Sequence, residues 1–147
     1  MQVIMSAALL VILFLVIVFG YEKRYGGYMP ETFRNRPCQG FVWKRAFPDS
    51  PNDEIRDFLY QFTQAFGYRR GQMLQVAPED TLIAIYRAEY PPGGFDVDQC
   101  ELEALAIQIK KKYKVEFTIL WSETLTFGML FTACCPGPVI TDTLVEF

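Results

Sequence analysis

Few residue types in this chain of 147 residues could do chemistry, because it contains no histidine. The absence of histidine excludes Ser-His-Asp and Cys-His catalysis and any zinc site with a histidine ligand. The densest cluster of titratable groups consists of the carboxylates Asp96, Asp98, Glu101 and Glu103. Carboxylate oxygens suit Mg²⁺ or Ca²⁺, but the spacing lacks the Asp-x-Asp-x-Asn-Gly pattern of a calcium loop. We therefore expect helix capping and an acidic docking surface here, and no metal site.

Two adjacent arginines form a second candidate site. Arg69 and Arg70, next to Tyr68, can bind a phosphate or an acidic partner, although a solvated pair is an equal alternative. Nucleic acid is not expected as a partner. After residue 45 the chain holds eight basic and 15 acidic residues, a net charge of −7, which repels a phosphate backbone.

The four cysteines suggest no catalytic motif. Cys38, Cys100, Cys134 and Cys135 lack the Cys-x-x-Cys spacing of zinc ribbons and thioredoxin-like proteins. Cys100 is expected in the core. Cys134 and Cys135 are expected as buried thiols that close a helix, with lipidation or redox use as lesser alternatives. The even number would also permit disulfides if the chain faced an oxidising compartment.

The N-terminus has the composition of a membrane segment. Residues 1–21 carry no charged side chain, and residues 3–19 are almost continuously apolar. About 20 such residues span a bilayer as a helix. A cleavable signal peptide is the alternative, but it would carry basic residues before the apolar run and a small-residue cleavage site after it. We therefore expect a retained transmembrane helix.

The flanking charges predict the orientation of this helix. Between Glu22 and Arg45 there are six basic residues and two acidic ones. Positive charge beside a span stays in the cytoplasm, so we expect the N-terminus outside and the body of the protein in the cytoplasm. The basic stretch could also contact anionic lipid, although determination of topology is its simpler role. The residues expected at the membrane interface are Tyr21, Lys23, Arg24, Tyr25 and Tyr28.

Beyond the span, the pattern predicts a mainly α protein in three further parts: a basic, aromatic Pro-Gly linker at 22–52, a helical-bundle domain at 53–135 and a tail at 136–147. Within the linker, the apolar residues 41–43 are expected to fold back on the domain or to lie on the bilayer. Helices are expected from 52 or 53 to about 66, from 99 to 113 and from 123 to 133, and a short segment with several apolar residues is expected to start at 80–81. A loop at 68–79 and an extended connector at 115–120 are expected between them.

The expected helix ends follow known capping preferences. Asn52 is a suitable N-cap, and Gly67 is a suitable stop for the same helix. Asp98 and Glu101 have capping-box spacing for the helix at 99–113. The apolar stripes of these helices are expected in the core: Ile55, Phe58, Leu59, Phe62, Phe66, Leu102, Leu105, Ala106, Ile109, Tyr113, Leu125, Phe127, Leu130 and Phe131.

The order of these elements resembles that of acyl carrier proteins. The local match is Asp98-Gln99-Cys100-Glu101-Leu102, followed by the segments 110–117 and 125–130. The likeness covers about residues 53–133 and is greatest to divergent, uncharacterised bacterial proteins, which implies a bacterial inner membrane. In the family a serine at the position of Gln99 carries phosphopantetheine, so the resemblance implies a degenerate carrier without that cofactor. Lys110-Lys111-Lys112 replaces the family's acidic triplet, which inverts the docking charge there.

Together these features predict a non-catalytic membrane-anchored module that binds a protein, as an adaptor or accessory subunit, with no cofactor. Alternatives are an immunity-type inhibitor of a toxin, and a residual acyl carrier or acyl or lipid sensor. The residues expected to bind the partner are Asp96, Asp98, Glu101, Glu103, Arg69 and Arg70.

Overall fold

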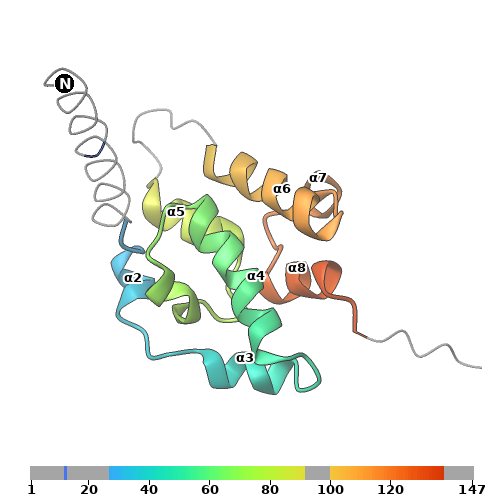
Figure 1. The fold of residues 1–147 in the computed structure, drawn as a ribbon. Coiled ribbons are helices and arrows are strands. Elements are labelled where there is room, and N and C mark those ends of the chain that lie inside the picture. The colour runs from blue at the N-terminus through green and yellow to red at the C-terminus, as the bar shows by residue number, and fades with distance from the viewer. Residues whose placement is uncertain (1–11, 13–26, 92–99, 138–147) are drawn as a thin grey trace, which may run out of the picture.

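The computed structural model describes residues 12, 27–91 and 100–137 (Figure 1). Its helices are α2 (Glu31–Arg34), α3 (Gly40–Ala46), α4 (Asn52–Ala65), the 3₁₀ helix η1 (Arg70–Gln75), α5 (Leu82–Glu89), α6 (Cys100–Tyr113), α7 (Phe117–Leu120) and α8 (Phe127–Cys134). The only β contacts among the described residues are two isolated bridges, which confirms a mainly α fold. No helix within these ranges is long and apolar enough to cross a bilayer. The expected span at 1–21 lies outside them except for residue 12, as do the tail beyond 137 and Asp98 of the expected capping box.

Helix α4 follows its apolar period closely. Ile55, Phe58 and Phe62 lie on one buried face, as the stripe predicts. The expected N-cap is wrong by one residue, because Asn52 is already helical and Pro51 precedes it with extended backbone. The Pro51 carbonyl accepts the first hydrogen bonds of the helix, so proline at this position costs no donor. Beyond α4, Gly67 has a φ of 68°, which agrees with its expected role as a stop.

The predicted linker at 22–52 is wrong over residues 29–47, which belong to the folded unit. Helices α2 and α3 form within it. Phe33 of α2, Trp43 of α3 and Met29, just before α2, are all buried. The indole Nε1 of Trp43 donates a 2.7 Å hydrogen bond to the Val76 carbonyl. Helices of four and seven residues are too short to show a period, which explains why the sequence pattern resembled a linker.

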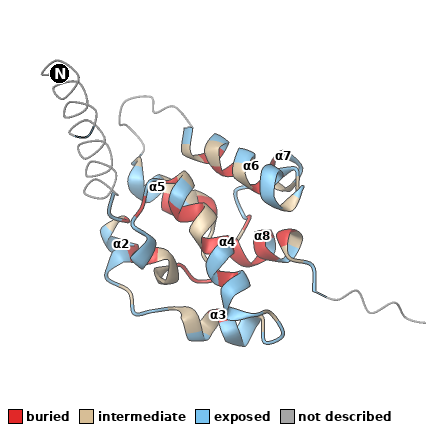
Figure 2. Ribbon diagram, viewed as in Figure 1, coloured by how far each residue is buried: buried red, intermediate tan, exposed pale blue. Residues whose placement is uncertain are grey.

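Helices α3, α4, α6 and α8 all contribute buried residues to the core (Figure 2), in which aromatic rings pack among aliphatic side chains. Phe131 of α8 packs edge-on against Phe58 of α4, with ring centroids 5.2 Å apart. It also contacts Trp43 of α3 at 5.7 Å. Phe62 of α4 packs against Phe127 at 4.7 Å. Helix α6 closes this core with its predicted stripe, of which Leu102, Leu105 and Ile109 are buried.

Helices α5 and α8 begin side by side. Thr81 and Thr126, which form an antiparallel bridge, are the N-caps of the two helices. The Asp80 carboxylate accepts hydrogen bonds of 2.7 and 2.9 Å from Nη1 of Arg36 and one of 2.7 Å from the Ala77 amide. The segment after α2 is therefore fastened to the start of α5. The short apolar segment expected after Asp80-Thr81 is the helix α5, and the helix expected from 123 starts at 127.

Two further expectations are wrong. Cys100 is exposed rather than in the core. It lies two residues before Leu102, and at 100° per residue that places it away from the buried stripe of α6. The connector at 115–120 is not extended throughout, because 117–120 form α7 and bury Phe117. The four residues of α7 make about one turn of helix, and its first residue is the buried one.

Candidate functional site

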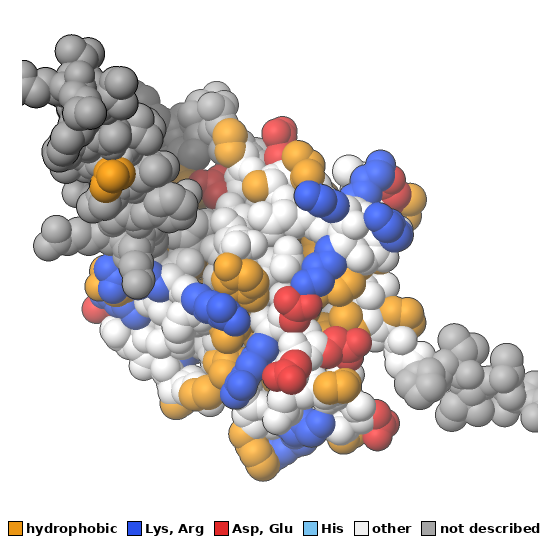
Figure 3. All heavy atoms as spheres, in the orientation of Figure 1, with side chains coloured by type: hydrophobic (Ala, Val, Ile, Leu, Met, Phe, Trp, Pro, Cys, Tyr) orange, Lys and Arg blue, Asp and Glu red, His pale blue; other side chains and the backbone are white. Residues whose placement is uncertain are grey.

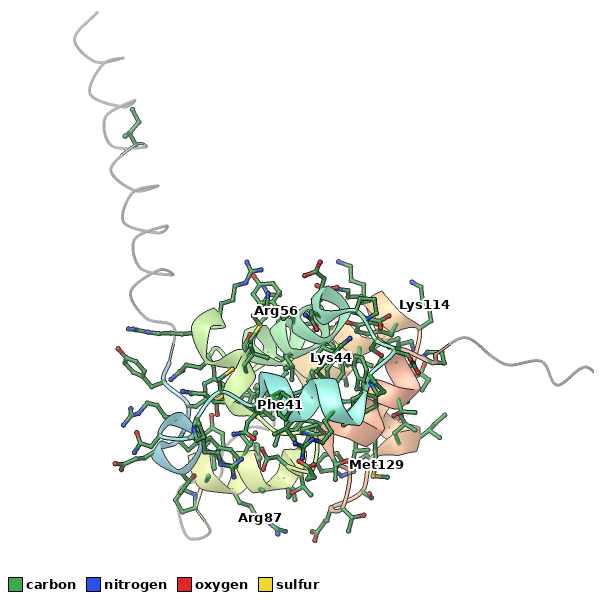
Figure 4. The ribbon with its side chains drawn as sticks, turned by 90° about the horizontal axis from the view of Figure 1, so that it is seen from below. Phe41, Lys44, Arg56, Arg87, Lys114 and Met129 are labelled. Carbon is green, nitrogen blue, oxygen red and sulfur yellow. The ribbon has the colours of Figure 1, made fainter. Side chains whose placement is uncertain are left out.

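A hollow of about 730 Å³ lies between the exposed face of α4 and the helix η1. Its lining residues are Asp53, Glu54, Arg56, Asp57 and Tyr60 of α4 and Arg70, Met73 and Leu74 of η1. A smaller hollow of about 170 Å³ shares Arg56 and Leu74 and extends to Trp43 and Lys44 of α3. The two hollows are therefore neighbours, and we call the larger one, between α4 and η1, the depression. Lys44 of the smaller hollow and Arg56, which lines both, are labelled in Figure 4.

The burial of α4's apolar stripe determines which side chains line this depression. With Ile55, Phe58 and Phe62 packed inward, the polar residues between them face solvent. Two of these, Asp53 and Glu54, lie in the first turn, where carboxylates are favoured by the helix dipole. Figure 3 shows acidic, basic and hydrophobic side chains intermingled on this face.

Several of these side chains are held in place by their neighbours. The guanidinium of Arg70 lies over the Tyr60 ring at 4.7 Å from its centroid. The Tyr60 hydroxyl accepts a 2.7 Å hydrogen bond from Gln64. Asp57 pairs with Lys112 of α6. The surface is thus partly ordered before any partner binds, which lowers the entropy cost of binding.

The structure separates the residues that the sequence grouped as a partner site. Arg70 lines the hollow, whereas Arg69 stacks on Tyr28 with its guanidinium 4.0 Å from the ring centroid. Within the described ranges, no hydrogen bond or ion pair joins Arg70 to Glu101 or Glu103. Asp96 and Asp98 lie outside these ranges, as does Gln99.

Glu101 is half-buried and is hydrogen-bonded within the domain. The Tyr90 hydroxyl donates a hydrogen bond to its carboxylate, and this bond raises the pKa of Tyr90. A parallel contact joins Tyr68 to Glu89 at 3.1 Å, and burial together with that carboxylate raises the pKa of Tyr68. Both phenols stay protonated near neutral pH and serve as donors. Of the two expected acidic residues that the structure describes, Glu101 and Glu103, Glu103 is the exposed one.

The adjacent cysteines at the end of α8 are shielded. Cys134 is buried, as expected, and Cys135 is half-buried. Burial raises the pKa of the Cys134 thiol to about 12 and that of Cys135 to about 11. Thiolates, the reactive species, are therefore scarce at neutral pH. Among the described residues, no group of three Cys, Asp or Glu side chains is arranged to hold a metal ion.

The residues expected at the membrane interface fall mostly outside the described ranges. Tyr21, Lys23, Arg24 and Tyr25 are among those outside. Tyr28 is described, and 52% of its surface is exposed. Its ring lies between two guanidinium groups, those of Arg34 at 5.5 Å and Arg69 at 4.0 Å.

The sequence analysis missed most of the hollow. The sequence predicted the ends and the buried stripe of α4, but no role was expected for its polar side. A usable signal was present, since Arg56 and Tyr60 are one helical turn apart and both types are common at protein interfaces. Met73 and Leu74 gave no signal, because a 3₁₀ segment has no apolar period to detect.

Comparison with known proteins identifies no relative: no family model, curated protein or solved structure matches this chain.

Proposed function

We propose that this protein is a non-catalytic, membrane-anchored module that binds a protein partner, as an adaptor or accessory subunit at a bacterial inner membrane. The observation that carries the proposal is the depression between α4 and η1, whose lining combines charged side chains of both signs with the apolar Met73 and Leu74. The anchor is the apolar segment 1–21, and its length and lack of charge support this role.

The residue types in the depression are those of a protein interface. Interfaces combine an apolar centre with a polar rim and are enriched in Tyr, Arg and Met. Here Met73 and Leu74 are the half-buried centre, while Arg56, Arg70 and Tyr60 provide side chains of the kind that dominate binding energy. The depression thus offers more for recognition than for acid–base or nucleophilic chemistry.

The distribution of charge suggests the chemistry of the partner. Asp53 and Glu54 at the start of α4 would accept a basic side chain, and Arg56 and Arg70 a carboxylate. A partner segment that carries both charges around an apolar residue fits this arrangement. The net acidity of the chain beyond residue 45 would also steer a basic partner towards it, with more effect on encounter rate and specificity than on affinity.

An acyl carrier or acyl sensor is a weaker candidate. The position of the attachment serine holds a glutamine. In addition, an acyl chain would have to lie between α4 and α8, and the packed rings of Phe58, Phe62, Phe127 and Phe131 fill that space. An immunity-type inhibitor of a toxin could use the same depression. The identity of the bound partner, a toxin or a subunit of a larger assembly, distinguishes this function from that of an adaptor.

The test is a pull-down of the full-length protein from its native membrane in mild detergent, with mass spectrometry of what is retained. The test variant is Arg56→Glu with Arg70→Glu, and the control is Lys111→Glu with Lys114→Glu, which changes the charge equally at another face. A stoichiometric partner retained by the wild type and the control but lost by the test variant supports the proposal. A partner retained by all three would place the binding surface elsewhere, and the lack of any partner would refute a protein-binding role.

A further inference from the structure

A separate hollow of about 440 Å³ lies where α4 packs against α6 (Figure 1). Its lining residues are Gln61 and Gln64 of α4 and Gln108, Lys111 and Lys112 of α6. On each helix these residues are three or four positions apart, so they share one face of that helix. The hollow shares no lining residue with the depression between α4 and η1, and its volume is in the range of small-molecule sites.

The lining of this hollow is polar and positively charged. All five residues described at its wall carry an amide or an ammonium group, so neither a carboxylate nor an apolar side chain is among them. A glutamine amide both donates and accepts hydrogen bonds, whereas a lysine ammonium group only donates. The ligand that fits this wall has an anionic group for the lysines and hydroxyl groups for the amides. An acyl chain or an aromatic ring would find no apolar side chain to pack against.

Part of the hydrogen-bonding capacity of this wall is unused. The Oε1 atom of Gln108 is buried and accepts no hydrogen bond. In the part of the chain that the structure describes, neither the Gln61 side chain nor the Lys111 ammonium group takes part in a hydrogen bond or an ion pair. A buried acceptor without a donor destabilises the folded state. A ligand hydroxyl that donates to Gln108 would remove that cost.

Lys112, the other lining cation, pairs with Asp57 of α4. Both side chains are partly exposed, and ion pairs at a protein surface contribute little to stability. Lys112 can therefore turn from this carboxylate to an anionic ligand at small cost. Lys110 also has an ion-pair partner, Glu116, but it does not line the hollow.

We propose that the hollow between α4 and α6 binds a small sugar or polyol that carries a phosphate group. Lys111 and Lys112 bind the phosphate as point charges, and the three glutamine amides bind hydroxyl groups. The inference is independent of the proposed function, because it concerns a different surface and a different class of ligand. It also gives a role to two residues of the lysine triplet 110–112, which the proposed protein interface does not use.

The experiment is a titration of the ¹⁵N-labelled full-length protein in mild detergent with glucose 6-phosphate, followed by NMR. Glucose and inorganic phosphate are titrated separately, because each supplies one half of the ligand. We expect glucose 6-phosphate to bind with the lowest Kd of the three. We also expect it to shift the side-chain amide signals of the lining glutamines.

Two variants separate the two halves of the site. Lys111→Gln removes the unpaired cation and is expected to weaken the binding of both glucose 6-phosphate and inorganic phosphate about tenfold. Gln108→Leu removes the buried acceptor, so it is expected to weaken the binding of glucose 6-phosphate about fivefold and to leave that of inorganic phosphate unchanged. The control is Lys114→Gln, which removes an equal charge three residues from Lys111 and outside the hollow, and should leave both Kd values unchanged.

A second matched pair tests the role of Lys112. Asp57→Asn frees Lys112 from its ion pair and is expected to tighten the binding of glucose 6-phosphate about threefold. Glu116→Gln removes the same charge but frees Lys110, which does not line the hollow, and is expected to have no effect.

Three results would overturn the inference. The first is glucose 6-phosphate that binds no more tightly than inorganic phosphate, or that does not bind. The second is equal weakening by Lys111→Gln and Lys114→Gln, which would indicate a general attraction of anions to this end of α6. The third is a Gln108→Leu variant that keeps the full preference for glucose 6-phosphate. Far-UV circular dichroism of each variant establishes that it is folded.

Discussion

Replacement of Trp43 by alanine tests whether the segment before α4 is part of the folded unit. The indole is fully buried, contacts Phe58 and Phe131, and donates a hydrogen bond to the Val76 carbonyl. Truncating a buried aromatic residue costs about 3–5 kcal/mol, through lost burial and the cavity that remains. We therefore expect Trp43→Ala to lower the free energy of unfolding by about 4 kcal/mol, roughly a thousandfold in the equilibrium constant.

A milder variant isolates the hydrogen bond. Trp43→Phe keeps an aromatic ring but leaves the Val76 carbonyl without its 2.7 Å donor, which is expected to cost about 1–3 kcal/mol. Phe41→Ala is the control: it lies on the same helix, 72% of its surface is exposed, and it should change stability by no more than about 0.5 kcal/mol.

The assay is urea unfolding of the full-length protein in mild detergent, followed by far-UV circular dichroism so that loss of the tryptophan does not affect the signal. The slope of the free energy against urea concentration should be similar in all variants, so that shifts of the midpoint report stability. If Trp43→Ala costs no more than Phe41→Ala, residues 29–47 do not stabilise the domain and the packing described above is wrong.

Three further changes have definite expected outcomes. Asp80→Ala removes the acceptor for Arg36 and the Ala77 amide, so thermal unfolding should show a loss of about 2–4 kcal/mol, while Asp80→Asn, which keeps an acceptor oxygen, should lose less. Gly128→Ala would place a methyl group 3.1 Å from the Pro78 carbonyl oxygen. Thermal unfolding should show that this variant loses about 1–3 kcal/mol of the free energy of unfolding. An unchanged free energy of unfolding would mean that the start of α8 can shift freely. Burial raises the pKa of the Cys135 thiol to about 11, so the folded state binds this proton more tightly than the unfolded chain does. The protonated thiol therefore contributes to the free energy of unfolding below pH 9, and this contribution is lost as the pH rises from 9 towards 11. Urea midpoints across that range should fall less steeply in Cys135→Ala than in the wild type, and equal slopes would contradict the shifted pKa.

The predictable part of this fold is the part with a long apolar period. The stripes of α4 and α6 cover four turns each, and burial of Phe58, Phe62 and Leu105 follows from their spacing alone. Helices α2 and α3 could not be found this way, since prolines interrupt the segment and each helix makes at most two turns. The large apolar side chain of Trp43 was the remaining clue, and the sequence alone left open whether it packs on the domain or on the bilayer.

Of the two walls of the depression, only the one formed by α4 could be predicted from the sequence. The polar side of α4 is visible in the sequence once its stripe is known, so Arg56 and Tyr60 could have been chosen. Its other wall depends on η1, whose position is set by long-range contacts such as the hydrogen bond from the Gln39 amide to the Leu74 carbonyl. Contacts of this kind leave no periodic trace in a single sequence, and the same is true of the hydrogen bond from the Arg69 amide to the Gly27 carbonyl.

The contact of Trp43 and Phe47 with Phe131 also has a consequence for the order of events during translation. The two partners of this contact come from opposite ends of the described chain, and contacts of such large sequence separation slow folding because a long loop must close first. On a ribosome, α3 emerges long before α8 has been synthesised. Until α8 is released, the nascent chain exposes Trp43 and one side of the α4 stripe, surfaces that favour aggregation. Helix α8, the last of the described helices to be synthesised, therefore completes the core, and truncation before Phe131 should leave the protein dependent on chaperones.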